Sequence, residues 1–192
     1  MKSGYRLVLT YNLIRTDYQG PGSANAISDE KASLRSVLKE WKRRYKAGQL
    51  TSEKLLYILD HKYSEANLCL ESLKGRDVIL GRILKESCDK EDFLLLFANM
   101  TKTILDAQAT NDGYGDPSEE EFHLENLVKA TGESFLREAK MSEDEIVQCS
   151  PHDRMPDEIT SKETGNEGVD ATHFYHDAVS YAVLKLNYHG LT

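Results

Sequence analysis

Strict alternation of side-chain character near the N-terminus predicts a β-strand over Tyr5–Ile14. One face of this strand would be wholly apolar or aromatic and would pack on a core, and it carries Tyr5, Leu7, Leu9, Tyr11 and Leu13. The other face carries Arg6, Val8, Thr10, Asn12 and Ile14. An arginine that points inward from a strand is costly unless it meets an anion, and its planar fork suits a carboxylate. The alternative, which the pattern alone favours, is an edge strand with Arg6 in water.

Helical spacing of apolar residues appears farther along the chain, and it predicts helices over Ser28–Ala47, Ser64–Lys74 and Asp77–Cys88. The first of these begins at a serine N-cap followed by acidic residues, and it stops at Gly48. Its apolar stripe consists of Leu34, Val37, Leu38, Trp41 and Tyr45.

Shorter apolar or alternating runs predict the remaining strands. These lie over Leu55–His61, Phe93–Ile104, a hairpin within Phe122–Leu136 that turns at Thr131–Gly132, and Tyr181–Tyr188. Segments dense in polar and turn-forming residues predict loops over 15–27, 111–117 and 149–168. The mixture of periodicities predicts an α+β fold with an antiparallel sheet and several helices, in one domain over residues 1–192.

Composition is that of a folded, acidic protein, with 40% hydrophobic residues, 29% charged residues and a net charge of −8. The charge disfavours nucleic acid and anionic membranes as partners, which leaves a protein or a small-molecule substrate. No apolar run is long enough to span a bilayer, and no signal-peptide pattern opens the chain. The three widely spaced cysteines fit reduced thiols, so we expect an intracellular protein, cytoplasmic or nuclear.

Two kinds of charge cluster invite a binding hypothesis. Basic residues surround Trp41 and Tyr45 and could meet a nucleic-acid backbone, although the solvent side of an amphipathic helix is the favoured explanation. The acidic runs Glu119–Glu121 and Glu143–Glu145 are explained most simply as solvated surface, with a docking site for a basic partner as the alternative.

The histidines raise the question of a metal site. On a helix, Asp170, His173, His176 and Asp177 would share one face and could hold a divalent ion. A solvated helix face is the favoured alternative, because the spacing matches no established metal pattern. His61 is expected at a strand end, where its ring makes a hydrogen bond.

Three stretches together resemble fungal 2-oxoglutarate/Fe(II)-dependent dioxygenases of the prolyl 4-hydroxylase-like type. They are Ser3–Leu13; Leu59–Asn67 followed by Leu73–Asp77; and Thr164–Gly168 followed by Tyr175 and Ala178. The resemblance implies that the first strand closes a double-stranded β-helix, or jelly roll, which is incomplete in this chain. It also implies that Arg6 is the cofactor-binding residue and holds the distal carboxylate of 2-oxoglutarate.

The chain departs from that family at the iron site. Members bind Fe(II) through two histidines and one carboxylate, but none of the six histidines here stands in a His-x-Asp pair. Val8 also stands where many members have a serine or threonine that shares the 2-oxoglutarate carboxylate. We therefore expect the C-terminal portion of a larger oxygenase, without catalytic or metal-binding residues, that binds neither cofactor alone.

Two functions follow from this resemblance. The intact enzyme would couple 2-oxoglutarate decarboxylation to a hydroxylation, with a prolyl side chain as one candidate substrate. The alternative is a non-catalytic protein-interaction or regulatory module derived from the family.

Overall fold

The computed structural model describes residues 24–50, 52, 54–106, 119–148, 154–163 and 169–185. Within these ranges the fold class is α+β, as the sequence predicts, with two α-helices, six β-strands and three short 3-10 turns. In chain order the elements are α1 (Ala24–Lys46), β1 (Lys54–Ile58), η1 (Glu65–Asn67), η2 (Leu70–Ser72), α2 (Gly75–Lys90), β2 (Phe93–Asp106), β3 (Glu119–Lys129), β4 (Ser134–Lys140), η3 (Glu143–Glu145), β5 (Glu158–Glu163) and β6 (Val169–Leu184).

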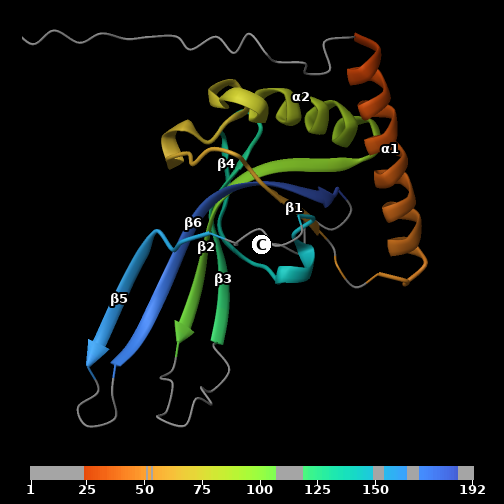
Figure 1. Cartoon of the computed structure of the whole chain (residues 1–192). Helices are drawn as coiled ribbons and strands as arrows, with labels where there is room; N and C mark the ends of the chain where they lie inside the picture. The colour runs from red at the N-terminus through yellow and green to blue at the C-terminus, as the bar shows by residue number, and fades with distance from the viewer. Residues whose placement is uncertain are drawn as a thin grey trace, which may run out of the picture.

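The described strands form one open antiparallel sheet in the order β1-β6-β2-β3-β4. β5 pairs with the N-terminal half of β6, and β1 pairs with its C-terminal half. Figure 1 shows α1 and α2 at one end of the long strands, while β5, β6, β2 and β3 extend together away from the helices. The sheet is therefore covered by helices over only part of its length.

Each face of the covered half of the sheet has its own apolar core. The helix side gathers Phe93, Leu95 and Phe97 of β2 with alternate residues of β6 and with Leu34, Leu38, Trp41 and Tyr45 of α1. Val37, predicted in the same apolar stripe, is instead 58% exposed. The opposite side gathers the intervening residues of the same strands, and Ile146 and Met141 from the segment around η3 pack there. This arrangement follows from strand alternation, because successive side chains of β2 and β6 point to opposite faces.

The predicted first helix is confirmed. The Trp41 ring lies 5.4 Å from the Phe93 ring and 5.7 Å from the Tyr45 ring, so the aromatic residues face the core. Gly48 has a φ of 67° and donates its N–H to the Tyr45 carbonyl, which ends the helix where the sequence predicts. The basic residues point outward or pair with acids, as a solvated helix face requires.

The hairpin prediction is also confirmed, since β3 and β4 pair around a turn in which Gly132 has a φ of 86°. The third predicted helix corresponds to α2, and the strands predicted after Leu55 and Phe93 correspond to β1 and β2.

The helix predicted over Ser64–Lys74 is wrong. This segment forms the separate 3-10 turns η1 and η2, and Leu68 and Leu73 are buried at either side of η2. Such apolar anchors at irregular spacing fasten an extended segment to the core, and they do not require a continuous helix.

Two predicted loops contain regular structure. α1 begins at Ala24, inside the loop expected over 15–27, and β5 occupies Glu158–Glu163 of the loop expected over 149–168. β5 is an edge strand that pairs only with β6 among the described strands, and Ile159 is exposed. An edge strand that is exposed to solvent does not need alternating apolar residues. Its polar sequence therefore predicted a loop.

The last strand is far longer than predicted, because β6 begins at Val169 and ends at Leu184. Some other predictions fall outside the described residues: the strand over Tyr5–Ile14, the turn over 111–117, and the state of Cys149. Cys69 and Cys88 are free thiols. Within the described ranges, no helix has the length and apolar character needed to cross a lipid bilayer.

Candidate functional site

Two distant segments of the chain meet at the side chain of Asp77. This residue lies in the first turn of α2, and it is only 1% exposed. The segment that follows β1, residues 60–63, passes directly over it. A buried carboxylate is costly unless its oxygens accept hydrogen bonds, so its neighbours decide what it does.

Four donors from residues 60–63 satisfy the Asp77 carboxylate. One oxygen accepts the backbone N–H of Asp60 at 2.9 Å. The other lies 3.1 Å from the His61 backbone nitrogen, 3.0 Å from His61 Nδ1 and 2.9 Å from the Tyr63 hydroxyl. Asp77 thus fastens the chain after β1 to the start of α2, and its oxygens are already engaged by its own chain.

Tyr63 extends this network, and it is itself buried. Its hydroxyl donates to Asp77 and accepts the backbone N–H of Lys74 at 2.8 Å. Burial, followed by the Asp77 carboxylate, raises the pKa of Tyr63 to about 12. The phenol therefore remains protonated and acts as a fixed hydrogen-bond donor.

Gly75 makes the close approach of His61 possible. Its φ is 54°, in the left-handed region that favours glycine, and a Cβ there would lie 2.7 Å from His61 Cε1. The glycine thus allows the imidazole to lie over the start of α2 while Nδ1 reaches Asp77. Asp77 orients His61 as a carboxylate orients a general base, but the side chain of His61 is 44% exposed.

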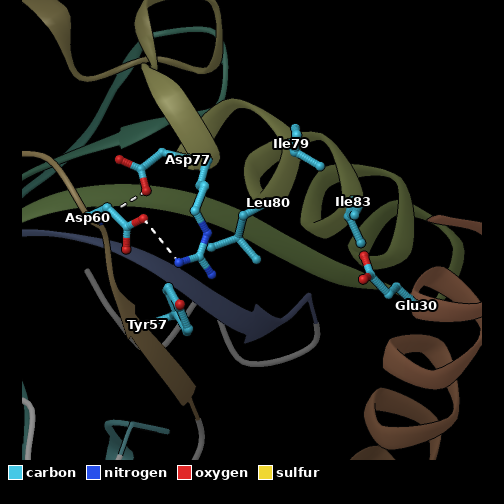
Figure 2. Close-up of a pocket in the computed structure, with 8 residues that line it drawn as sticks. Glu30, Tyr57, Asp60, Asp77, Ile79, Leu80 and Ile83 are labelled. Atoms are coloured by element: carbon cyan, nitrogen blue, oxygen red, sulfur yellow. Dashed lines mark hydrogen bonds and ion pairs between the residues drawn. The ribbon is translucent and has the colours of Figure 1, made fainter. Parts of the chain in front are cut away.

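A hollow of about 230 Å³ adjoins this network, between the start of α2, the end of β1 and α1. Figure 2 shows Asp60 and Asp77 at one end, Glu30 of α1 at the other, and Leu80 and Ile83 between them. The Arg76 guanidinium lies 3.7 Å from the Asp60 carboxylate across the mouth. The hollow thus has an apolar wall between two acidic ends, and at one of them Asp77 is engaged by residues 60–63 and Asp60 by Arg76.

A second polar cluster lies at Arg154, before β5. The guanidinium donates to Asp157 and to Asp177 of β6, each at 3.0 Å, and lies over the Tyr175 ring at 5.4 Å. Asp157 also accepts the His176 backbone N–H and pairs with Lys62. Burial alone would raise the pKa of Asp157, but the His176 N–H, Lys62 and Arg154 hold it well below its usual range. This cluster fastens the segment before β5 to β6.

The structure settles the geometry behind the metal hypothesis. His173, His176 and Asp177 lie in a strand and not in a helix, so His176 points to the face opposite to the other two. His176 Nδ1 lies 3.2 Å from the Thr101 hydroxyl, while Asp177 pairs with Arg154. Within the described ranges, no three His, Cys, Asp or Glu side chains are grouped so as to hold a metal ion.

The remaining candidates separate into two groups. Arg6 lies outside the described residues, as do its neighbours Val8 and Thr10. The hydrogen bond predicted for His61 after β1 is confirmed, and its partner is Asp77. The importance of Asp77 itself was missed from the sequence, because an acidic residue in the first turn of a helix is usually solvated. Glu145, expected as solvated surface, is 8% exposed and caps η3.

Comparison of the chain with protein-family models, with curated proteins and with solved structures finds no match.

Proposed function

We propose that this chain is a non-catalytic interaction module that corresponds to the C-terminal region of a 2-oxoglutarate/Fe(II)-dependent oxygenase. The observation that carries the proposal is the Asp77 network. Two of the stretches that carry the resemblance meet there, Leu59–Asn67 and Leu73–Asp77. Their polar groups form hydrogen bonds with one another. A segment that served only as a linker would have no need of a buried carboxylate with four donors.

The network supports a structural role and not a catalytic one. The two oxygens of Asp77 together accept four hydrogen bonds from residues 60–63, so the carboxylate is occupied in holding this segment in place. The described residues also do not fit Fe(II), which needs two histidines and a carboxylate grouped together. We therefore assign no reaction step to these residues.

The N-terminal segment has the role in this function that its resemblance implies. Tyr5–Ile14 would form a closing strand of the incomplete double-stranded β-helix, and Arg6 would hold the distal carboxylate of 2-oxoglutarate when upstream iron ligands are present. The six-stranded sheet would then be a separate layer of the same oxygenase.

Turnover of 2-oxoglutarate tests the non-catalytic assignment. The purified chain, supplied with Fe(II), ascorbate and 2-oxoglutarate, should release succinate only at the rate of a protein-free control. Iron-dependent succinate release above that rate, abolished by a chelator, would overturn the proposal.

The family assignment has its own test in a version of the chain extended upstream in its genomic reading frame. If that version is active, Arg6→Ala should raise the KM for 2-oxoglutarate roughly 10-fold or more, because a charge-assisted pair to the carboxylate is lost. Lys2→Ala is the matched control, since it removes a cation outside the strand. An unchanged KM in the Arg6 variant would refute the assignment of Arg6.

A further inference from the structure

The helix side of the sheet changes from apolar to polar in the middle of β2. Phe97 is the last buried apolar residue of β2 on this face, and it is followed there by Asn99 and Thr101, which are partly exposed. The β6 residue opposite Thr101 is the exposed His176. This part of the face therefore carries hydrogen-bonding groups where the part under the helices carries a core.

A hollow of about 310 Å³ lies at this boundary. It lies between three strands of the sheet and the segment that follows β1. Its lining consists of Lys62, Tyr63, Asn99, Met100, Thr101, Glu125, Asn126, His176 and Asp177. Because Asp77 holds residues 60–63 in place, this wall of the hollow is already formed before any ligand arrives.

A β-bulge places two amide side chains at the hollow. The register of β2 with β3 shifts between Phe97 and Asn99, and Asn126 has a φ of 54°, which asparagine tolerates better than most residues. Asn126 Nδ2 donates to Asn99 Oδ1 at 3.3 Å, and Asn99 Nδ2 donates to the Tyr63 carbonyl at 2.8 Å. These bonds orient both amides while using only part of their capacity to donate and accept.

A hydroxyl and two rings continue the site along β6. His176 Nδ1 lies 3.2 Å from the Thr101 hydroxyl. Phe174 lies two residues before His176 on the same face, and the two rings are parallel within 7°, with centroids 6.4 Å apart. Polar groups and apolar ring surface thus lie side by side.

The charges at the hollow favour an uncharged ligand. Lys62 pairs with Asp157, and Asp177 pairs with Arg154, so two of the charged lining residues are neutralised by ion pairs. Glu125 also lines the hollow and is exposed. An anion would be repelled by Glu125, and a cation would be repelled by Lys62.

We propose that this hollow binds a neutral pyranose sugar. Sugar hydroxyls both donate and accept, which matches two amides, a hydroxyl, an imidazole and a carboxylate. The C–H face of a pyranose is apolar and suits the rings of Phe174 and His176. The proposal goes beyond the interaction-module function and uses none of the cofactor chemistry. Its failure would leave the succinate result untouched, so the two can be distinguished.

Nuclear magnetic resonance of the ¹⁵N-labelled full chain tests the binding. The probes are methyl β-D-glucopyranoside, methyl α-D-mannopyranoside and methyl N-acetyl-β-D-glucosaminide. At least one should bind with a Kd below about 10 mM, and the amide signals of Thr101, Asn126 and His176 should shift most. Sorbitol carries its hydroxyls on a flexible chain and should bind about 10-fold more weakly. No binding of any pyranoside, or shifts centred elsewhere, would overturn the proposal.

Three variants locate the site. Asn126→Gly keeps the positive φ but removes the amide, and Thr101→Val removes the hydroxyl at nearly constant shape, so each should weaken binding about 5-fold. Thr103→Val is the matched control, because it lies on the same face of β2 but outside the lining, and it should change the Kd less than about 2-fold. Circular dichroism checks that the variants are folded. Equal affinities of the Thr101 and Thr103 variants would overturn the assignment of the site.

A longer probe distinguishes a single sugar from the end of a glycan chain. The tetrasaccharide of the best-bound sugar is titrated in the same way. Binding about 10-fold tighter assigns the site to a glycan, and equal affinity assigns it to a single sugar. Tetrasaccharide binding that Asn126→Gly leaves unchanged would mean that the ligand binds elsewhere and would overturn the proposal.

Discussion

Asp77 is the residue on which the region after β1 depends. Its carboxylate is buried and accepts from two backbone amides, an imidazole and a phenol. Removing it leaves those donors without their acceptor, and the cost is greatest for the buried Tyr63 hydroxyl, because an unmade buried hydrogen bond costs more than a made one contributes. Asp77 therefore stabilises the fold by accepting hydrogen bonds from residues 60–63.

Asp77→Ala should lower the free energy of unfolding by about 3 kcal/mol, because one buried and three partly buried donors lose their acceptor at once. Asp60→Ala is the matched control, since the Asp60 side chain is 41% exposed and, among the described residues, forms its ion pair with Arg76 at 3.7 Å. The control should change stability by less than about 1 kcal/mol. Urea titration of both variants measures the difference, and equal losses would contradict the role given to Asp77.

Tyr63 makes stability depend on alkaline pH. Its folded-state pKa of about 12 lies above the ordinary value of 10.0. Its contribution to stability is therefore fully present below about pH 10 and declines as the pH rises toward 12. Tyr63→Phe should be less stable at neutral pH, but it should lose less stability than the native chain between pH 9 and 11.5. Parallel loss in both proteins would argue against a buried phenol.

At the scale of elements, α1 is held to the sheet by its aromatic stripe and by a charged margin. Trp41 contacts Phe93 at the start of β2. Arg35 and Lys39 pair with Glu91 at 2.8 and 3.7 Å, and Lys42 pairs with Asp92 at 2.6 Å, so the turn before β2 receives three cations from the helix. Although Glu91 is buried, its cationic partners are exposed and solvent screens them, so the apolar contact should dominate.

Trp41→Ala should destabilise the fold by about 2 kcal/mol, because a half-buried indole leaves a gap between α1 and β2. Val37→Ala, on the same helix but 58% exposed, should cost less than about 0.5 kcal/mol. Thermal unfolding followed by circular dichroism compares the two. A larger effect from Val37 would mean that α1 packs through a different face.

The sequence predicted correctly those elements whose formation depends on residues close together in the chain. The α1 stripe apart from the exposed Val37, the α2 spacing and the turn at Gly132 were all visible, because each reflects burial of one face or a glycine at positive φ. β5 and the first half of β6 were not, because they extend beyond the helix-covered cores and alternate weakly. The pairing of β6 with β1 joins residues far apart in the sequence, such as Val183 and Lys54, and no local pattern encodes it.

The candidate site was predictable only in part, for a related reason. His61 follows a strand, so a hydrogen bond there was expected, but the acceptor lies 16 residues away in α2. Asp77 looks like an ordinary first-turn acid, which is usually solvated and favours the helix dipole. Only the fold brings residues 60–63 over it and turns a surface residue into a buried one.

At the scale of the whole molecule, β6 is the centre of the sheet. It pairs with β2 along its length on one side, and with β5 and then β1 on the other. Its C-terminal half is fully enclosed, since residues 178–184 are all buried. Stability is therefore expected to be greatest there and to decline toward the strands at the edges.

Amide hydrogens of Val179–Val183 should exchange last, at the rate set by global unfolding, because both sides of this stretch are bonded to other strands. Amides of β4 and β5 should exchange earlier through local opening. Hydrogen–deuterium exchange with mass spectrometry measures the order, and early exchange in β6 would contradict the sheet order described above.

The place of β6 between β1 and β2 also affects how the protein is made. Translation proceeds at about 5–20 residues per second, so β1 and β2 leave the ribosome several seconds before the strand that joins them. During that interval β6 is not yet available to join β1 to β2, so one edge of β2 has no neighbour among the described strands. The nascent chain therefore exposes the edge of an apolar strand until β6 is synthesised. Such an edge favours aggregation unless a chaperone covers it or synthesis is completed quickly.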